Sequence, residues 1–154
     1  MMFKTHLMLG FLVGLLAIPY FPIKNKFLFL VLVTICSSLP DMDHAKSRIN
    51  RNIPLLKVFS FLFRHRGIMH SLLAALVLSI LAWYYLSQDI AYAVGIGFLA
   101  HLFGDALTKN GVELFYPFSK VKIKGCIRTG GLLEKICFYL IITGAIYEIA
   151  KLYG

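Results

Sequence analysis

The stretch FLFLVLVTICSSLPDMDHAKS, residues Phe27–Ser47, runs from an apolar segment directly into two carboxylates and an imidazole. The apolar part is typical of a membrane-spanning helix, and Pro40 marks its end because proline disfavours helix in the preceding residue. Two interpretations of Asp41, Asp43 and His44 then compete. They are either a solvated helix end at a membrane surface or part of a metal site, and the rest of the sequence has to decide.

The composition is that of a membrane protein. Of the 154 residues, 59% are hydrophobic and 15% are charged, and the mean hydropathy is +0.78. A soluble domain normally has about 45–50% apolar and about 25% charged residues. We therefore expect an all-α integral membrane protein that forms a single polytopic domain over residues 1–154.

Five apolar segments are candidates for transmembrane helices, at residues 5–20, 26–39, 68–86, 90–107 and 132–150. The first two are short for a span of about 20 residues, so tilting or local thinning of the bilayer is expected. Residues 45–63 are basic and then amphipathic, which predicts a short helix in the membrane interface. Residues 110–131 are too polar to span, and their alternating pattern favours a small β-hairpin or an extended loop.

Consecutive spans run in opposite directions, which brings nearly all of the chain's metal-ligating side chains to one side of the membrane. Thirteen of the 16 lysines and arginines lie on that same side, so the positive-inside rule makes it cytoplasmic. We read the net charge of +9 as this asymmetry together with contact to anionic lipid, and not as nucleic-acid binding. The candidate ligands on this side are His6, Asp41, Asp43, His44, His65, His70, His101, Asp105 and Glu134.

His101 and Asp105 are four residues apart on a predicted helix, so they share one face and can hold one ion or simply bond to each other. The Asp41–His44 cluster combines carboxylates with an imidazole, a set that suits zinc, manganese or iron. Asp43, His70 and Glu134 are the candidate acid/base groups. The candidate residues for binding a substrate phosphate are Arg66, Lys124 and Arg128.

Several motifs, taken together, resemble those of a known protein family. They are Thr5-His6, LPDMDH at residues 39–44, HRGIMHS at 65–71, HLFGDALT at 101–108 and GVELFYPF at 111–118. In this order they resemble the YdjM-like family, whose members are described as membrane-bound metal-dependent hydrolases. The resemblance covers nearly the whole chain and implies metal binding and hydrolysis. The H-x-x-x-D pair is also similar in ligand chemistry, though not necessarily in fold, to zinc-dependent phospholipase C enzymes.

Nine candidate ligands exceed the three that a catalytic zinc normally takes from protein. We expect two or more divalent ions, zinc first, with manganese or iron as alternatives. Such a site suits hydrolysis of a phosphoester in a phospholipid or lipid-linked phosphate, whose tails stay in the bilayer. Two other functions compete. A metal transporter needs polar groups reaching both faces, and a non-catalytic structural or regulatory protein needs a closed metal site. The sequence does not specify the oligomeric state.

Overall fold

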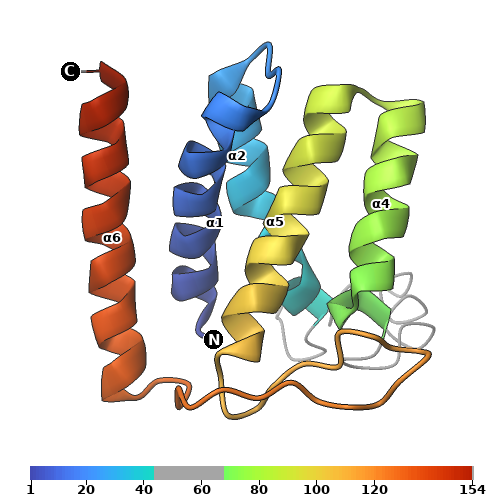
Figure 1. Cartoon of the computed structure of the whole chain (residues 1–154), viewed down its shortest axis with the longest axis vertical. Helices are drawn as coiled ribbons and strands as arrows, with labels where there is room; N and C mark the ends of the chain where they lie inside the picture. Colours follow the sequence, from blue (N-terminus) through green and yellow to red (C-terminus); the bar gives the residue numbers. More distant parts are fainter. Residues whose placement is uncertain (44–67, 154) are drawn as a thin grey trace, which may run out of the picture.

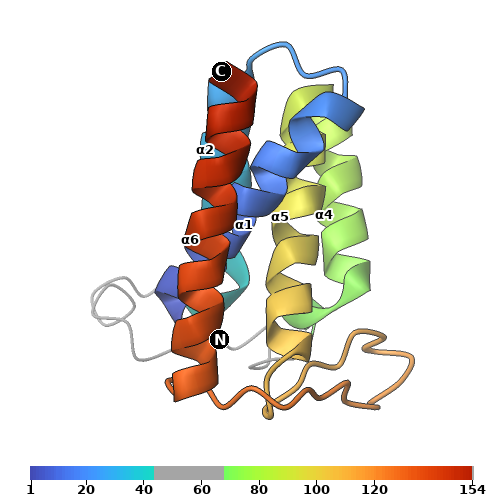
Figure 2. The ribbon, with the colours of Figure 1, turned by 60° about the vertical axis from the view of Figure 1, so that its left-hand side comes forward.

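The computed structural model describes residues 1–43 and 68–153, and in these residues the protein is all-helical (Figure 1). The expected interfacial helix at residues 45–63 lies outside the described residues. Five α-helices form a bundle in which both short 3₁₀ helices that carry site residues lie at the same end (Figures 1 and 2). The helices are α1 (Phe3–Ala17), α2 (Lys26–Cys36), α4 (Leu72–Tyr85), α5 (Gln88–Ala106) and α6 (Leu132–Tyr153), with 3₁₀ helices at Ile18–Tyr20, Leu39–Asp43 and Ile68–His70.

Short polar residues start three of these helices. The side chains of Asn25, Ser71 and Ser87 accept hydrogen bonds from the backbone N–H groups three residues later, as N-caps do. The helix α2 ends at Cys36, before Pro40, as the sequence predicts. The LPDMD segment that follows is a 3₁₀ helix, so Asp41 lies on a regular turn.

The helix α5 is central to the bundle and contacts α1, α2 and α4, whereas α6 packs against α1. Phe29 and Val33 of α2 and Ala93 of α5 are buried in the main hydrophobic core. Further along α5, a Cβ built on Gly97 would lie 2.6 Å from Cys36 Cβ and 2.8 Å from the Val33 carbonyl oxygen. Only glycine permits this approach, and it brings the end of α2 close to the following turns of α5, where His101 and Asp105 lie.

The segment between α5 and α6 crosses beneath the bundle at the end where residue 1 lies (Figure 1). No strand forms in this part of the described chain, so the extended-loop alternative fits better than the β-hairpin. An isolated antiparallel bridge joins Val112 to Ile123 through two 3.0 Å hydrogen bonds, and the Leu72 N–H donates to the Leu114 carbonyl at 2.9 Å. These bonds fix the loop against the start of α4.

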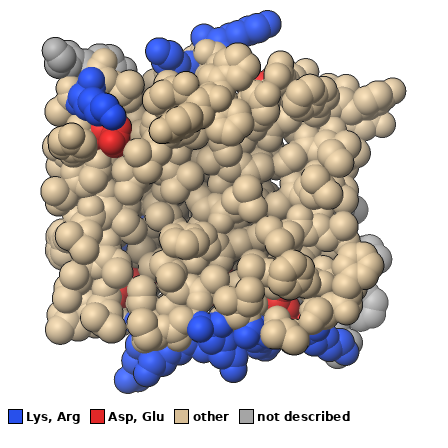
Figure 3. Space-filling model, in the orientation of Figure 1, with Lys and Arg blue, Asp and Glu red and all other residues tan. Residues whose placement is uncertain are grey.

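Phe3–Tyr20 is the one described segment with both the length and the apolar composition to cross a membrane, and Leu72–Tyr85 is apolar but shorter. Each of the five expected spans is largely helical in its described part. The helices α5 and α6 are also long enough, at 19 and 22 residues, but of the described segments only Phe3–Tyr20 meets both the length and the composition criteria. Lysine and arginine side chains gather at the two ends of the bundle and leave an uncharged band between them (Figure 3). This distribution of charge is the one a bilayer-embedded bundle needs.

Candidate metal centre

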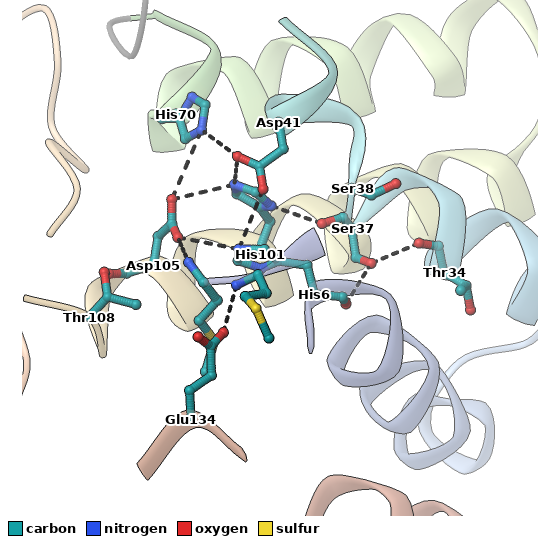
Figure 4. Close-up of polar contacts among 12 residues, drawn as sticks. His6, Thr34, Ser37, Ser38, Asp41, His70, His101, Asp105, Thr108 and Glu134 are labelled. Atoms are coloured by element: carbon teal, nitrogen blue, oxygen red, sulfur yellow. Dashed lines mark hydrogen bonds and ion pairs between the residues drawn. The ribbon is translucent and has the colours of Figure 1, made fainter. Parts of the chain in front are cut away.

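Four side chains from different parts of the chain converge at the loop end of the bundle (Figure 4). Asp41 comes from the 3₁₀ helix after α2, His70 from the turn before α4, and His101 and Asp105 from α5. One ligand atom from each lies within 4.8 Å of every other. The predicted His101–Asp105 pair is thus confirmed as neighbours, with 3.6 Å between Nε2 and Oδ2.

The two carboxylates divide their oxygens between two directions. Asp41 Oδ1 lies 3.7 Å from His70 Nε2 and 3.9 Å from His101 Nε2. Asp105 Oδ2 faces the same pair of histidines, at 4.0 Å and 3.6 Å. Ligands at zinc bond lengths of about 2.0–2.1 Å lie roughly 3.4 Å apart in a tetrahedron. These four atoms lie within 4.8 Å of one another, so the widest spacing would have to shorten by about 1.4 Å to hold one ion.

The remaining oxygen of each carboxylate faces His6 in α1. His6 Nε2 lies 3.2 Å from Asp105 Oδ1 and 3.7 Å from Asp41 Oδ2. The His6 ring stacks on His101 with 4.0 Å between ring centroids. The Met1 amino group also lies 2.7 Å from Asp105 Oδ1, so a cationic group already contacts this oxygen. His6 therefore belongs to the cluster, as the sequence predicted.

Ser37 orients the centre, although sequence reasoning did not single it out. Its carbonyl oxygen lies 2.8 Å from His101 Nδ1, and because a carbonyl only accepts, Nδ1 carries the proton and Nε2 presents its lone pair to Asp41 and Asp105. The Ser37 hydroxyl donates to the His6 carbonyl at 2.9 Å. Ser37, at the end of α2, thus fixes the backbone of His6 and the ring of His101. The sequence feature that could have indicated this role is the polar pair Ser37-Ser38 at the end of an apolar helix.

Burial makes these imidazoles unusual. His6 and His101 are fully buried, and His70 and Asp105 nearly so. Within the described residues, both ring nitrogens of His6 and His70 and Nε2 of His101 make no hydrogen bond. A buried polar group without a partner costs about 1–3 kcal/mol, so five such atoms at one place indicate a missing ligand.

Asp41 is the most accessible member of the centre, with 18% of its side chain exposed. Burial favours the neutral acid, but the neighbouring imidazoles of His70, His101 and His6 outweigh it and hold the pKa of the Asp41 carboxyl below its usual value. An ionised carboxylate is the form that binds a cation.

The other predicted site residues lie in different surroundings. Glu134, at the start of α6, is fully buried, and its carboxylate accepts from the Met2 N–H and the Gly130 N–H at 2.6 Å each. It is outside the four-residue group, so its roles as ligand and acid/base group stay predictions. Lys124 and Arg128 are exposed on the loop. His44, His65, Arg66 and the Asp43 side chain lie outside the described residues.

A small polar cavity of about 20 Å³ adjoins the centre. His70 and Asp105 form one wall, and Gly111, Val112, Glu113 and Lys122 of the loop form the other. Lys122 Nζ lies 3.4 Å from Glu113 Oε1. Glu113 was not among the residues that the sequence predicted for the site, because nothing local to the sequence shows that the loop folds back over His70.

The helical bundle and its centre define a class of protein: a helical membrane protein with a His/Asp group able to hold a metal ion. The chain belongs to the YdjM inner membrane protein family, which it matches over residues 1–150. The resemblance inferred from the motifs is therefore confirmed.

Two relatives illustrate the range of the family. YvsG of Bacillus subtilis (strain 168) is 32% identical over 136 residues, covering 86% of this chain and 84% of that protein. The inner membrane protein YdjM of Escherichia coli (strain K12) is 38% identical over 88 residues, covering 51% of this chain and 44% of YdjM. The alignment thus spans less than half of the longer E. coli protein. No solved structure matches the chain.

Proposed function

We propose that this YdjM-family protein is a membrane-embedded, metal-dependent hydrolase that cleaves a phosphoester in a phospholipid or lipid-linked phosphate. The proposal depends above all on one observation. Asp41 and Asp105 each direct one oxygen to the His70–His101 pair and the other to His6. Carboxylates that face two ways in this manner are suited to bridging two cations.

The residues present fit metal ions well. At the first position, Asp41, His70, His101 and Asp105 supply two imidazole nitrogens and two carboxylate oxygens. At the second, His6 joins the other oxygen of each carboxylate. Nitrogen and oxygen donors of this kind bind zinc, with manganese or iron as alternatives. We therefore propose that the centre would hold two ions, one with Asp41, His70, His101 and Asp105 and one with His6 and the same two carboxylates.

The second position has fewer protein ligands than the first. His6, Asp41 and Asp105 would supply three groups there once the Met1 amino group, 2.7 Å from Asp105 Oδ1, has moved away. Three is the number of protein ligands that catalytic zinc sites take while leaving a position open. A closed four-ligand site alone would favour the structural or regulatory alternative. The three-ligand position is what favours catalysis.

The chain's own residues then have separable tasks in hydrolysis. Bound ions of this type polarise a phosphoryl oxygen and lower the pKa of water. Ser37 keeps Nε2 of His101 directed at the carboxylates. Lys124 and Arg128 are exposed on the loop at this end of the bundle and can bind the phosphate of a lipid headgroup, together with Arg66. We assign His70 as a ligand because its Nε2 faces both carboxylates, and Asp43 stays a candidate acid/base group.

A lipid substrate suits the position of the centre in the bundle. The centre lies at one end, next to the band of uncharged surface seen in Figure 3. We propose that α1, α2, α4, α5 and α6 all span the inner membrane, with the centre and residue 1 on the cytoplasmic side. A lipid headgroup can then reach the centre while its acyl chains stay in the bilayer.

The test is a paired measurement on detergent-purified protein. Metal content is measured by mass spectrometry, and phosphate or phosphorylated headgroup release is measured from phosphatidic acid, phosphatidylglycerol and a prenyl diphosphate. We expect two ions per chain and hydrolysis of at least one lipid. Asp105→Ala should lose both ions and the activity, because it contributes an oxygen to each position. His6→Gln should retain one ion.

Asp89→Ala is the matched control, since Asp89 lies at the opposite end of the bundle, where it accepts from the Lys24 and Asn25 N–H groups. It should keep both ions and full activity. A wild-type protein that binds ions but hydrolyses no lipid would favour the structural alternative. Zinc or manganese flux in proteoliposomes would instead favour the transporter.

A further inference from the structure

The polar cavity beside the centre has the size of a single water molecule. Its volume of about 20 Å³ exceeds the roughly 10–15 Å³ that one water needs, and it is too small for a lipid headgroup. Its lining supplies the polar partners that an ordered water requires. Two of these, His70 and Asp105, belong to the metal centre, and two others, Glu113 and Lys122, come from the loop.

The loop wall of the cavity is held in a defined position. The Val112–Ile123 bridge lies on either side of the Glu113–Lys122 pair in sequence, and the Leu114 carbonyl is bonded to the Leu72 N–H, two residues after His70. Gly111 has φ +66°, and a Cβ there would come within 2.6 Å of the Ile123 carbonyl oxygen. These contacts fix Glu113 opposite His70 and Asp105.

Glu113 is the carboxylate in this cavity that no metal position uses. Its side chain is 20% exposed, and its Oε1 lies 3.4 Å from Lys122 Nζ. No histidine of the centre is paired with it among the described residues. A carboxylate that shares a water-sized cavity with metal ligands has the position needed to accept a proton from that water.

We propose that Glu113 is the general base of this site and activates the attacking water, with Lys122 as its positioning residue. The inference rests on the proposed hydrolase function. In the step, an O–H bond of water breaks and its proton passes to a Glu113 oxygen, while the water oxygen forms a bond to phosphorus. The P–O bond to the lipid alcohol breaks, the leaving oxygen takes up a proton from solvent, and Glu113 releases its proton.

The experiment uses purified wild-type protein, Glu113→Gln and Glu113→Ala, with the lipids named above as substrates. We expect Glu113→Gln to lower kcat by about 10²–10⁴-fold with little change in KM. Its metal content should equal that of the wild type, because Glu113 is a base and not a ligand. Formate should restore at least tenfold activity to Glu113→Ala, where the shortened side chain leaves room for it. Formate should not activate Glu113→Gln, in which the amide fills that space.

Two further variants separate catalysis from loop structure. Lys122→Met breaks the ion pair with Glu113 but keeps the carboxylate. Because half-exposed ion pairs contribute about 0–1 kcal/mol, activity should fall by no more than about fivefold. Glu148→Gln, which alters the exposed pair with Lys151 near the other end of the bundle, should leave activity unchanged.

Three results would overturn the inference while leaving the hydrolase function in place. They are loss of metal in Glu113→Gln, equal losses of activity in Lys122→Met and Glu113→Gln, and a Glu113→Ala variant that formate does not rescue. A wild-type protein that hydrolyses none of the lipids would overturn both proposals together.

Discussion

Nδ1 of His101 donates a hydrogen bond to the carbonyl oxygen of Ser37 over 2.8 Å, and the opposite nitrogen of the same ring faces Asp41 and Asp105. This bond joins α5 to the end of α2. It forms because Gly97, four residues before His101, lets the two backbones approach. Helix packing and ligand orientation are therefore coupled, and the coupling can be tested.

Gly97→Ala should separate α2 from α5. The new Cβ would meet Cys36 Cβ, the Val33 carbonyl oxygen and the Ser37 nitrogen at 2.6–3.0 Å, and these are mostly backbone atoms that cannot move alone. We expect a loss of about 1–3 kcal/mol in the free energy of unfolding, together with weaker metal binding. Thermal unfolding in detergent and metal titration measure the two effects.

Gly144→Ala is the matched control in α6. Its Cβ would lie 3.5 Å from the Leu12 side chain, which is an ordinary contact, so the variant should be neutral or slightly more stable. Equal destabilisation of both variants would show that the close approach at Gly97 has no special importance.

Glu134→Gln tests whether Glu134 serves the fold or the metal. Its carboxylate accepts from Met2 and Gly130, and an amide offers only one oxygen, so one buried N–H loses its partner. We expect destabilisation of about 1–3 kcal/mol with unchanged metal content. Loss of an ion in this variant would instead support the ligand role that the sequence predicts.

Metal removal should destabilise the protein in proportion to the ions it holds. A ligand whose free concentration is about 100 times its dissociation constant stabilises the folded state by about 2.7 kcal/mol. A chelator should therefore lower the Tm of the wild type, and added zinc should restore it. Asp105→Ala should have the same Tm with and without zinc. If zinc raises the Tm of Asp105→Ala as much as that of the wild type, the ions bind elsewhere.

Much of the architecture could be predicted from the sequence because long apolar runs separated by polar turns indicate helices without any periodic pattern. The starts and ends of α5 and α6 follow from Ser87 and from the polar loop between them. The convergence of His6, Asp41, His70, His101 and Asp105 followed from the alternating direction of the helices alone.

The finer parts of the site depend on contacts that no local pattern encodes. Ser37 acts through its main-chain carbonyl, which every residue has, so its residue type did not reveal its role. Glu134 is polar and lies at the same end of the bundle as the centre, yet its carboxylate accepts hydrogen bonds from the backbone N–H groups of Met2 and Gly130. Glu113 reaches the cavity only because the loop folds back and bonds to Leu72.

The helix α6 supplies no member of the four-residue group and packs on the rest of the bundle through α1. During synthesis, every residue of that group is added to the chain before the first turn of α6 is made. The centre can therefore assemble within the earlier helices, and Glu134 then captures the Met2 N–H as the last helix docks. The order of synthesis thus allows these four side chains to meet before the last helix closes the bundle.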